Sequence, residues 1–258
     1  MTRKERHRQS LIIATLGPST DDEKELKTMI IAGIARQWTD GVDIARVLYS
    51  DGRDLSKERI DKFRAESKKR DCNTKIYLDT DSDNLQEWSS YINFAKEIQP
   101  KYFVVMKKMG KEKILDAKQQ LGDQIQVGVR IKENDETSDL QEFYKISDFI
   151  MIEFDSKKIV NEQIVKNAKE NNCEPIYLAK MPTLMKGQVQ SREENFEIGH
   201  TLEEGFDVIA LYQETSHGPY PARSVKCIDE IAVESEKLRI NPMKDLIDSI
   251  FSFFGKKN

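Results

Sequence analysis

Leu11-Ile12-Ile13-Ala14-Thr15-Leu16-Gly17-Pro18-Ser19-Thr20 is the stretch that decides the fold class of this chain. An apolar run stops at a Gly-Pro-Ser-Thr turn, as is typical of a buried parallel strand that leads into a loop. Seven similar runs follow. The expected strands are Leu11–Thr15, Asp43–Leu48, Lys75–Leu78, Tyr102–Met106, Ile125–Val129, Phe149–Glu153, Pro175–Ala179 and Val208–Tyr212.

Charged amphipathic segments separate these runs and are expected to be helices. The clearest are Lys57–Lys69, Lys111–Leu121, Lys158–Asn171 and Arg223–Lys237. Strand and helix alternating eight times predict a closed α/β (β/α)8 TIM barrel with the helices outside. An open doubly wound sheet is the alternative, although such a sheet usually needs fewer units.

Size and composition agree with one barrel domain, since 258 residues suffice for this fold. The chain is 38% hydrophobic, with no apolar run long enough for a bilayer and no secretory leader pattern, so we expect a soluble cytoplasmic protein. A net charge of −4 argues against nucleic-acid binding. Residues 1–9 form a basic segment, which we interpret as a solvated tail with Arg3, Lys4, Arg6, His7 and Arg8.

Cysteine and histidine are too few and too scattered for several common kinds of site. Cys72, Cys173 and Cys227 lie far apart, and no pair of cysteine or histidine residues has metal-ligand spacing. We therefore expect reduced thiols, and neither a zinc site nor a Ser-His-Asp triad.

A barrel places its chemistry on the loops at the carboxyl ends of the strands. There, Glu133, Asp155 and Glu214 could gather a divalent cation, and Arg46, Arg130 and Lys180 could bind an anion. The alternative is that these groups are solvated loop charges or ion pairs that cap the barrel. Lys180 could also form a Schiff base, although a surface ammonium is the commoner role of such a lysine.

Two segments resemble the barrel domain of the pyruvate kinase family. Gly41–Gly52 reads GVDIARVLYSDG and is similar to the family's second strand, which ends Ala-Arg-Leu-Asn-Phe-Ser-His-Gly. Glu214–Pro221 reads ETSHGPYP and is similar to its Gly-Glu-Thr-Ala…Gly-x-Tyr-Pro signature. Leu78-Asp79-Thr80 matches the third strand, and the resemblance covers roughly residues 9–237.

The resemblance implies specific roles for matched residues. Arg46 stands where the family holds the transferred phosphoryl group. Ser50, Asp79 and Thr80 match three potassium ligands, whereas Leu48 replaces the fourth, an asparagine. An apolar side chain cannot supply the missing oxygen.

The catalytic centre departs from the family pattern. Lys-Ile-Glu-Asn at strand five corresponds to Ile131-Lys132-Glu133-Asn134, so Glu133 keeps the magnesium position and Lys132 matches the catalytic lysine only after a one-residue shift. Neighbouring residues of a strand point to opposite faces, which separates Lys132 from Glu133. At strand six the second magnesium ligand becomes Ser156, or Asp155 shifted by one.

Other parts of the family's machinery have no counterpart. Lys180 replaces the proton-handling threonine of strand seven, and Asp81–Leu85 leaves no room for the lid domain over the nucleotide. The regulatory domain is also missing, so no nucleotide is expected. Phosphoryl transfer needs metal, a cationic clamp and exclusion of water.

We therefore expect a binding or structural pseudoenzyme that has lost phosphotransfer. The alternative is a magnesium-dependent lyase or aldolase acting on phosphoenolpyruvate, oxaloacetate or pyruvate, and residual pyruvate kinase activity is a more distant one. Any binding of Mg²⁺ or K⁺ depends on the residues named above.

The end of the chain carries an amphipathic pattern of its own. Residues 243–258 are expected to form a helix after a linker at 238–242 that contains Pro242, whereas the barrel spans 10–237. One apolar stripe contains Met243, Leu246, Ile247, Ile250, Phe251 and Phe254. This helix could cover its own barrel, dock a protein partner or lie on a membrane, and Asp245 and Asp248 disfavour an anionic membrane. We expect the stripe to bind a protein partner.

Overall fold

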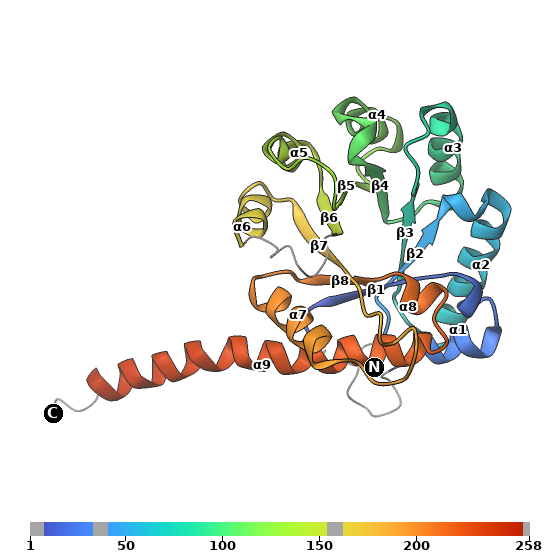
Figure 1. Ribbon diagram of the computed structural model, residues 1–258. Coiled ribbons are helices and arrows are strands. Elements are labelled where there is room, and N and C mark those ends of the chain that lie inside the picture. Colours follow the sequence, from blue (N-terminus) through green and yellow to red (C-terminus); the bar gives the residue numbers. More distant parts are fainter. Residues whose placement is uncertain (1–7, 33–40, 154–161, 255–258) are drawn as a thin grey trace.

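The computed structural model describes residues 8–32, 41–153 and 162–254, with residues 238–254 as backbone only. The chain folds as a (β/α)8 TIM barrel, in which the described strands are parallel and β1 pairs with both β2 and β8 (Figure 1). The strands are β1 Leu11–Thr15, β2 Ile44–Leu48, β3 Lys75–Asp79, β4 Tyr102–Met106, β5 Gln126–Lys132, β6 Phe149–Glu153, β7 Glu174–Ala179 and β8 Val208–Leu211. The predicted closed barrel is confirmed.

Helices surround the barrel and connect its strands (Figure 1). The α-helices are α1 Glu23–Ile30, α2 Arg53–Lys69, α3 Trp88–Ile98, α4 Lys111–Leu121, α5 Leu140–Ile146, α6 Glu162–Glu170, α7 Arg192–Glu203, α8 Gln213–Ser216 and α9 Pro221–Phe254. Short 3-10 helices follow the first four strands: η1 Pro18–Thr20, η2 Tyr49–Asp51, η3 Leu85–Glu87 and η4 Lys107–Met109.

Most predicted boundaries agree with the structure to within one residue, and β5 is the main exception among the strands. It continues to Lys132, three residues beyond the predicted end at Val129. This extension carries Arg130 and Lys132 on the strand itself, so the alternation of the pleat fixes their directions. The first residues of the predicted helix Lys158–Asn171 lie outside the described part of the chain.

Two apolar layers hold the barrel together. The interior is filled by side chains such as Tyr77, Tyr102, Phe149 and Met151, whereas a larger layer lies between the strands and the helices. Gly128 makes room for the Phe149 ring, because a Cβ at this glycine would lie 2.3 Å from a ring carbon. Close packing of bulky side chains inside the barrel is typical of this fold.

Arg8 closes the end of the barrel at which the strands begin. Its side chain is fully buried, and its Nε donates to Asp229 Oδ1 of α9 at 2.9 Å. Its Nη1 lies 3.0 Å from Asp43 Oδ2, and its Nη2 donates to the carbonyl of Gly41 at 3.0 Å. The expectation of a solvated basic tail is therefore wrong for Arg8, because three acceptors from distant segments converge on it. Residues 1–7 lie outside the described part.

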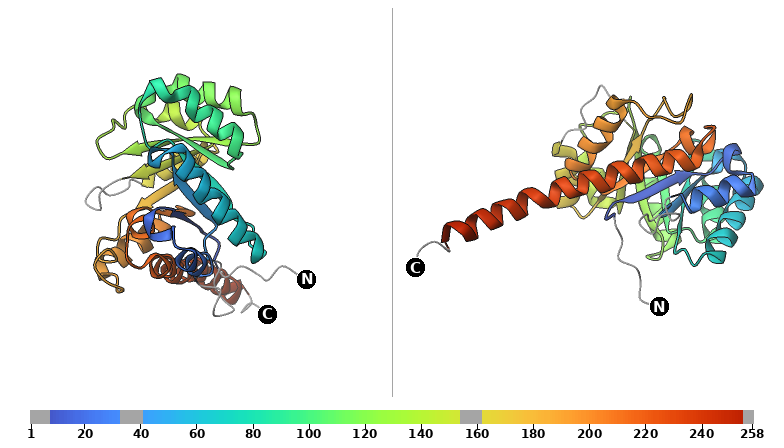
Figure 2. Two further views of the ribbon diagram at one scale, coloured as in Figure 1. Left: turned by 90° about the vertical axis from the view of Figure 1, so that its right-hand side faces the viewer. Right: turned by 90° about the horizontal axis from the view of Figure 1, so that it is seen from below.

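Helix α9 is a single helix from Pro221 to Phe254. Its first half packs on α1 and α7, and its second half projects beyond the barrel (Figures 1 and 2). The predicted linker at 238–242 is therefore wrong. Pro242 removes one backbone donor and disfavours a helix, but it does not end this one. Within the described residues, no helix is both long enough and apolar enough to span a membrane.

Candidate functional site

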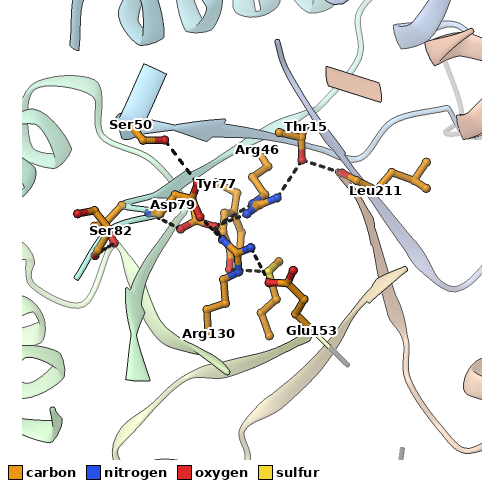
Figure 3. A network of polar contacts seen from close by, with 12 residues as sticks. Thr15, Arg46, Ser50, Tyr77, Asp79, Ser82, Arg130, Glu153 and Leu211 are labelled. Carbon is orange, nitrogen blue, oxygen red and sulfur yellow. Dashed lines mark hydrogen bonds and ion pairs between the residues drawn. The ribbon is translucent and has the colours of Figure 1, made fainter. Parts of the chain in front are cut away.

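A buried network of charged side chains lies at the carboxyl ends of the strands (Figure 3). We call it the mouth network. It consists of Thr15, Arg46, Asp79, Asp81, Arg130 and Glu153. These residues come from β1, β2, β3, the loop after β3, β5 and β6, so only closure of the barrel brings them together.

Arg46 is fully buried and directed toward Asp79. Its Nε and Nη2 both donate to Asp79 Oδ2, at 2.9 and 2.6 Å, and its Nη1 lies 3.1 Å from Thr15 Oγ1. Thr15 in turn donates to the carbonyl of Leu211 at 2.7 Å. The guanidinium also lies 4.9 Å from the centroid of the Tyr212 ring, a favourable cation–π distance. Arg46 is therefore held on every side by protein groups.

Arg130 approaches the same carboxylate from the opposite side of the barrel. Its Nη1 donates to Asp81 Oδ1 at 2.6 Å and lies 3.2 Å from Asp79 Oδ2. Its Nη2 donates to Glu153 Oε2 at 2.7 Å. The side chain is 2% exposed, and its Nε is buried without a hydrogen-bond partner. Arg130 thus joins the carboxylates of two strands and one loop.

Three carboxylates face two guanidinium groups, which leaves the mouth network with a formal charge of −1. Burial raises the pKa of Asp79, but the charges of Arg46 and Arg130 outweigh it and hold that pKa below its ordinary value. Burial lowers the pKa of Arg130, and the charges of Asp79, Glu153 and Asp81 more than reverse this effect. Asp79 and Arg130 are therefore both ionised at neutral pH, and each of the two guanidinium groups has a counterion within the protein.

The residues matched to a potassium site do not fit that ion. Asp79 Oδ2 accepts from both arginines, and Oδ1 accepts from the backbone N–H of Asp81 at 2.8 Å. Thr80 is buried and donates to the carbonyl of Ser82, whereas exposed Ser50 lies 3.5 Å from Asp81. A cation at Asp79 would meet two guanidinium charges at hydrogen-bond distance, so the geometry disfavours K⁺ there.

The described residues do not form a magnesium site either. Asp155 lies outside the described residues, and Glu133 is half-buried in the turn after β5. Glu214 is buried and accepts from the backbone N–H groups of Met181 at 2.6 Å and Tyr212 at 3.3 Å. These bonds tie the ends of β7 and β8 together. Across the part of the chain that the structure describes, no three histidine, cysteine or acidic side chains form a metal-binding group.

The predicted catalytic residues are dispersed. Arg46 belongs to the mouth network, but Lys132 and Lys180 do not. The backbone N–H of Lys132 donates to Asp135 at 2.8 Å, and Lys180 is exposed beyond the end of β7. Arg130, two residues before Lys132, occupies the position that faces the centre of the barrel mouth (Figure 3).

The sequence interpretation missed Asp81 and Glu153 as members of this site. Glu153 had a usable signal, because Phe149, Met151 and Glu153 follow the alternation of residues that point into the barrel. Asp81 also had one, because Asp79-Thr80-Asp81 stands at the carboxyl end of a predicted strand, where a barrel places polar groups, but the contact with Arg130 depends on the path of the loop. The predicted partner-binding side chains, Met243, Leu246, Ile247, Ile250, Phe251 and Phe254, lie on α9 outside the part described with side chains.

Comparisons with known proteins add no family to this description. No protein-family model matches the chain, and no curated protein sequence matches it.

Proposed function

We propose that this chain is a pyruvate-kinase-like barrel that has lost phosphotransfer and acts as a binding or structural protein, with a C-terminal helix that docks a partner. The observation that carries the first part is the mouth network. Both of its guanidinium groups are buried and already paired with carboxylates of the same chain.

Phosphoryl transfer needs cationic groups that are available to the charge on phosphate. In this barrel, Arg46 could bind a phosphate only after it broke two bonds to Asp79. Arg130 would have to release Asp81 and Glu153. The released carboxylates would then face the incoming anion in a buried space, where repulsion between like charges is strong. The same pairing supports a structural role for the network.

The second part rests on the length of α9. The helix continues well past the barrel that its first half covers, and its distal sequence carries an apolar stripe (Figure 2). A helix that presents such a stripe away from its own domain is typical of groove-binding segments.

Ligand binding at the mouth can be measured by titration calorimetry of the full chain. We expect no saturable heat with millimolar Mg²⁺, and none when phosphoenolpyruvate or oxalate is added in its presence. Saturable binding that Glu133→Ala abolishes and Glu136→Ala preserves would instead support the magnesium-dependent enzyme. Glu136 is a matched control because it is exposed and lies in the same turn region.

Deletion of residues 243–258 tests whether the distal helix belongs to the barrel. We expect the Tm of the barrel, measured at a chain concentration low enough to keep the protein monomeric, to change by no more than about 1–2 °C, because a segment that does not pack on its own barrel contributes about 0.5 kcal/mol or less. Ile228→Ala is the comparison, since Ile228 lies fully buried in the proximal part of α9 and its truncation should cost about 2–5 kcal/mol. A loss of stability on deletion as large as that of Ile228→Ala would contradict partner docking.

A further inference from the structure

A large cleft lies between β7 and α7 and reaches the mouth of the barrel, where Glu153, Tyr212 and Glu214 line it. Its volume is about 1250 Å³, and it extends from Tyr177 and Ala179 of β7 along α7 to Glu204. Clefts that hold small molecules measure about 300–1,000 Å³, so this one suits a larger occupant. We call it the β7–α7 cleft.

The walls of the β7–α7 cleft are held in place by hydrogen bonds. Ser191 caps the start of α7, and the Glu194 carboxylate accepts from the backbone N–H groups of Thr183 at 2.8 Å and Ser191 at 2.7 Å. The hydroxyl of Tyr177 donates to Glu197, which joins the strand to the helix. The cleft is therefore a built feature of the fold.

The lining combines apolar and acidic groups. Phe196 is 75% exposed, the rings of Phe196 and His200 stack, and Pro182 and Met185 complete the apolar part. Six glutamates line the cleft against one lysine and one arginine, and Glu153 is paired with Arg130, which leaves a formal charge of −3 with His200 neutral. An amphipathic segment with a positive charge is the complementary occupant.

The distal part of α9 has these properties. Residues 238–258 contain Arg239, Lys244, Lys256 and Lys257 against Asp245 and Asp248, a formal side-chain charge of +2. From typical side-chain areas, the six apolar residues of the stripe would bury about 700 Å². Each contact buries a similar area on the cleft, so two reciprocal contacts together bury about 2,800 Å², which lies in the range of stable homodimers.

A chain cannot insert this segment into its own cleft without breaking α9. The helix is continuous to Phe254, and Ile250 follows Ala232 by 18 residues, or five complete turns, so both lie on the same side of the axis. Ala232 is buried on the barrel, whereas the C-terminal half of α9 projects past the barrel's edge (Figure 2). The distal half of the helix thus extends beyond the barrel that the first half covers.

We propose that the β7–α7 cleft of one chain receives the distal α9 segment of a second copy, which forms a reciprocal homodimer. This inference rests on the proposed function, because it names the partner of the C-terminal helix.

The test uses four full-length proteins measured by size-exclusion chromatography with light scattering. The wild type should have twice the chain mass of 29.9 kDa. Phe196→Glu, in the cleft, and Ile250→Glu, in the tail, should each give the single-chain mass. Leu115→Glu is the matched control, because Leu115 is 52% exposed on α4 and should leave the dimer intact.

An equimolar mixture of Phe196→Glu and Ile250→Glu is the decisive sample. The first variant keeps an intact tail and the second an intact cleft, so the mixture should regain a dimer held by one contact. Two tails that paired with each other would leave Phe196→Glu dimeric by itself, and this result overturns the proposal. A mixture in which both variants keep the single-chain mass would overturn it as well.

A monomeric wild type would also overturn it. That result differs from failure of the proposed function, which would appear as saturable ligand binding at the mouth or as loss of stability of the monomeric barrel when the tail is deleted.

Discussion

Asp79→Ala should lower the free energy of unfolding by about 3–5 kcal/mol at pH 7, the cost expected when one partner of a buried ion pair is removed. Asp79 is fully buried and is the carboxylate shared by Arg46 and Arg130. Without it, Arg46 keeps Thr15 and the Tyr212 ring but has no carboxylate partner among the described residues. Urea unfolding of the two proteins measures the difference.

Asp54→Ala is the matched control for this substitution. The Asp54 side chain is 97% exposed beside Arg53, so its loss should change stability by no more than about 0.5 kcal/mol. Equal effects of the two substitutions would show that the mouth network is not a stabilising ion-pair cluster.

The effect of Asp79→Ala should also depend on pH. The folded-state pKa of Asp79 lies below its ordinary value of 3.8, so its ionised form stabilises the fold above that pH. This contribution is lost as the pH falls from 3.8 through the folded-state pKa. The difference in free energy of unfolding between wild type and Asp79→Ala should therefore be constant from pH 7 to pH 5 and should decrease below pH 3.8. A difference in free energy of unfolding that stays unchanged below pH 3.8 would contradict the proposed charge on Asp79.

Arg8→Ala should be comparably damaging, again by about 3–5 kcal/mol, because it removes the cation from a buried cluster at the opposite end of the barrel. Asp229 of α9 and Asp43 before β2 both lose their charge-assisted bonds to Arg8, as does the carbonyl of Gly41. Thermal or urea unfolding reports the loss. Since these partners come from three segments of the chain, the whole unfolding transition should shift to a lower temperature or urea concentration, and no separate transition should appear.

Two further variants separate the causes of this effect. Arg8→Lys should recover only part of the lost stability, because one ammonium cannot reproduce the fixed fork of a guanidinium. Arg53→Ala, in which the side chain is 52% exposed and paired with Glu97, should cost at most about 1 kcal/mol. Equal losses of stability in Arg8→Ala and Arg53→Ala would show that the buried cluster around Arg8 stabilises the fold no more than an exposed ion pair does.

Sequence predictions were correct where the signal lies within a few neighbouring residues, and they were wrong where the outcome depends on distant parts of the chain. The eight strands were predictable because each is a short apolar run with turn residues at its end, a signal contained within a few residues. Pro242 misled the boundary prediction, since a proline lowers helix stability without forbidding a helix. Arg8 led to a different wrong prediction, that of a solvated residue. A basic residue near a terminus is usually solvated, and its burial depends on acceptors that are 33 to 221 positions away.

The sequence by itself determined the barrel, the polar residues at its strand ends and the apolar stripe of the last helix. These follow from local periodicity, and periodicity can be read without coordinates. Tertiary structure alone decided which charges neutralise one another. Arg46, Asp79, Arg130 and Glu153 lie on four different strands, and only the closure of the barrel sets the hydrogen-bond distances between them. Ion pairing depends on those distances and on burial. The sequence therefore could not show whether the two arginines are available to bind an anion or are already paired with carboxylates of the same chain.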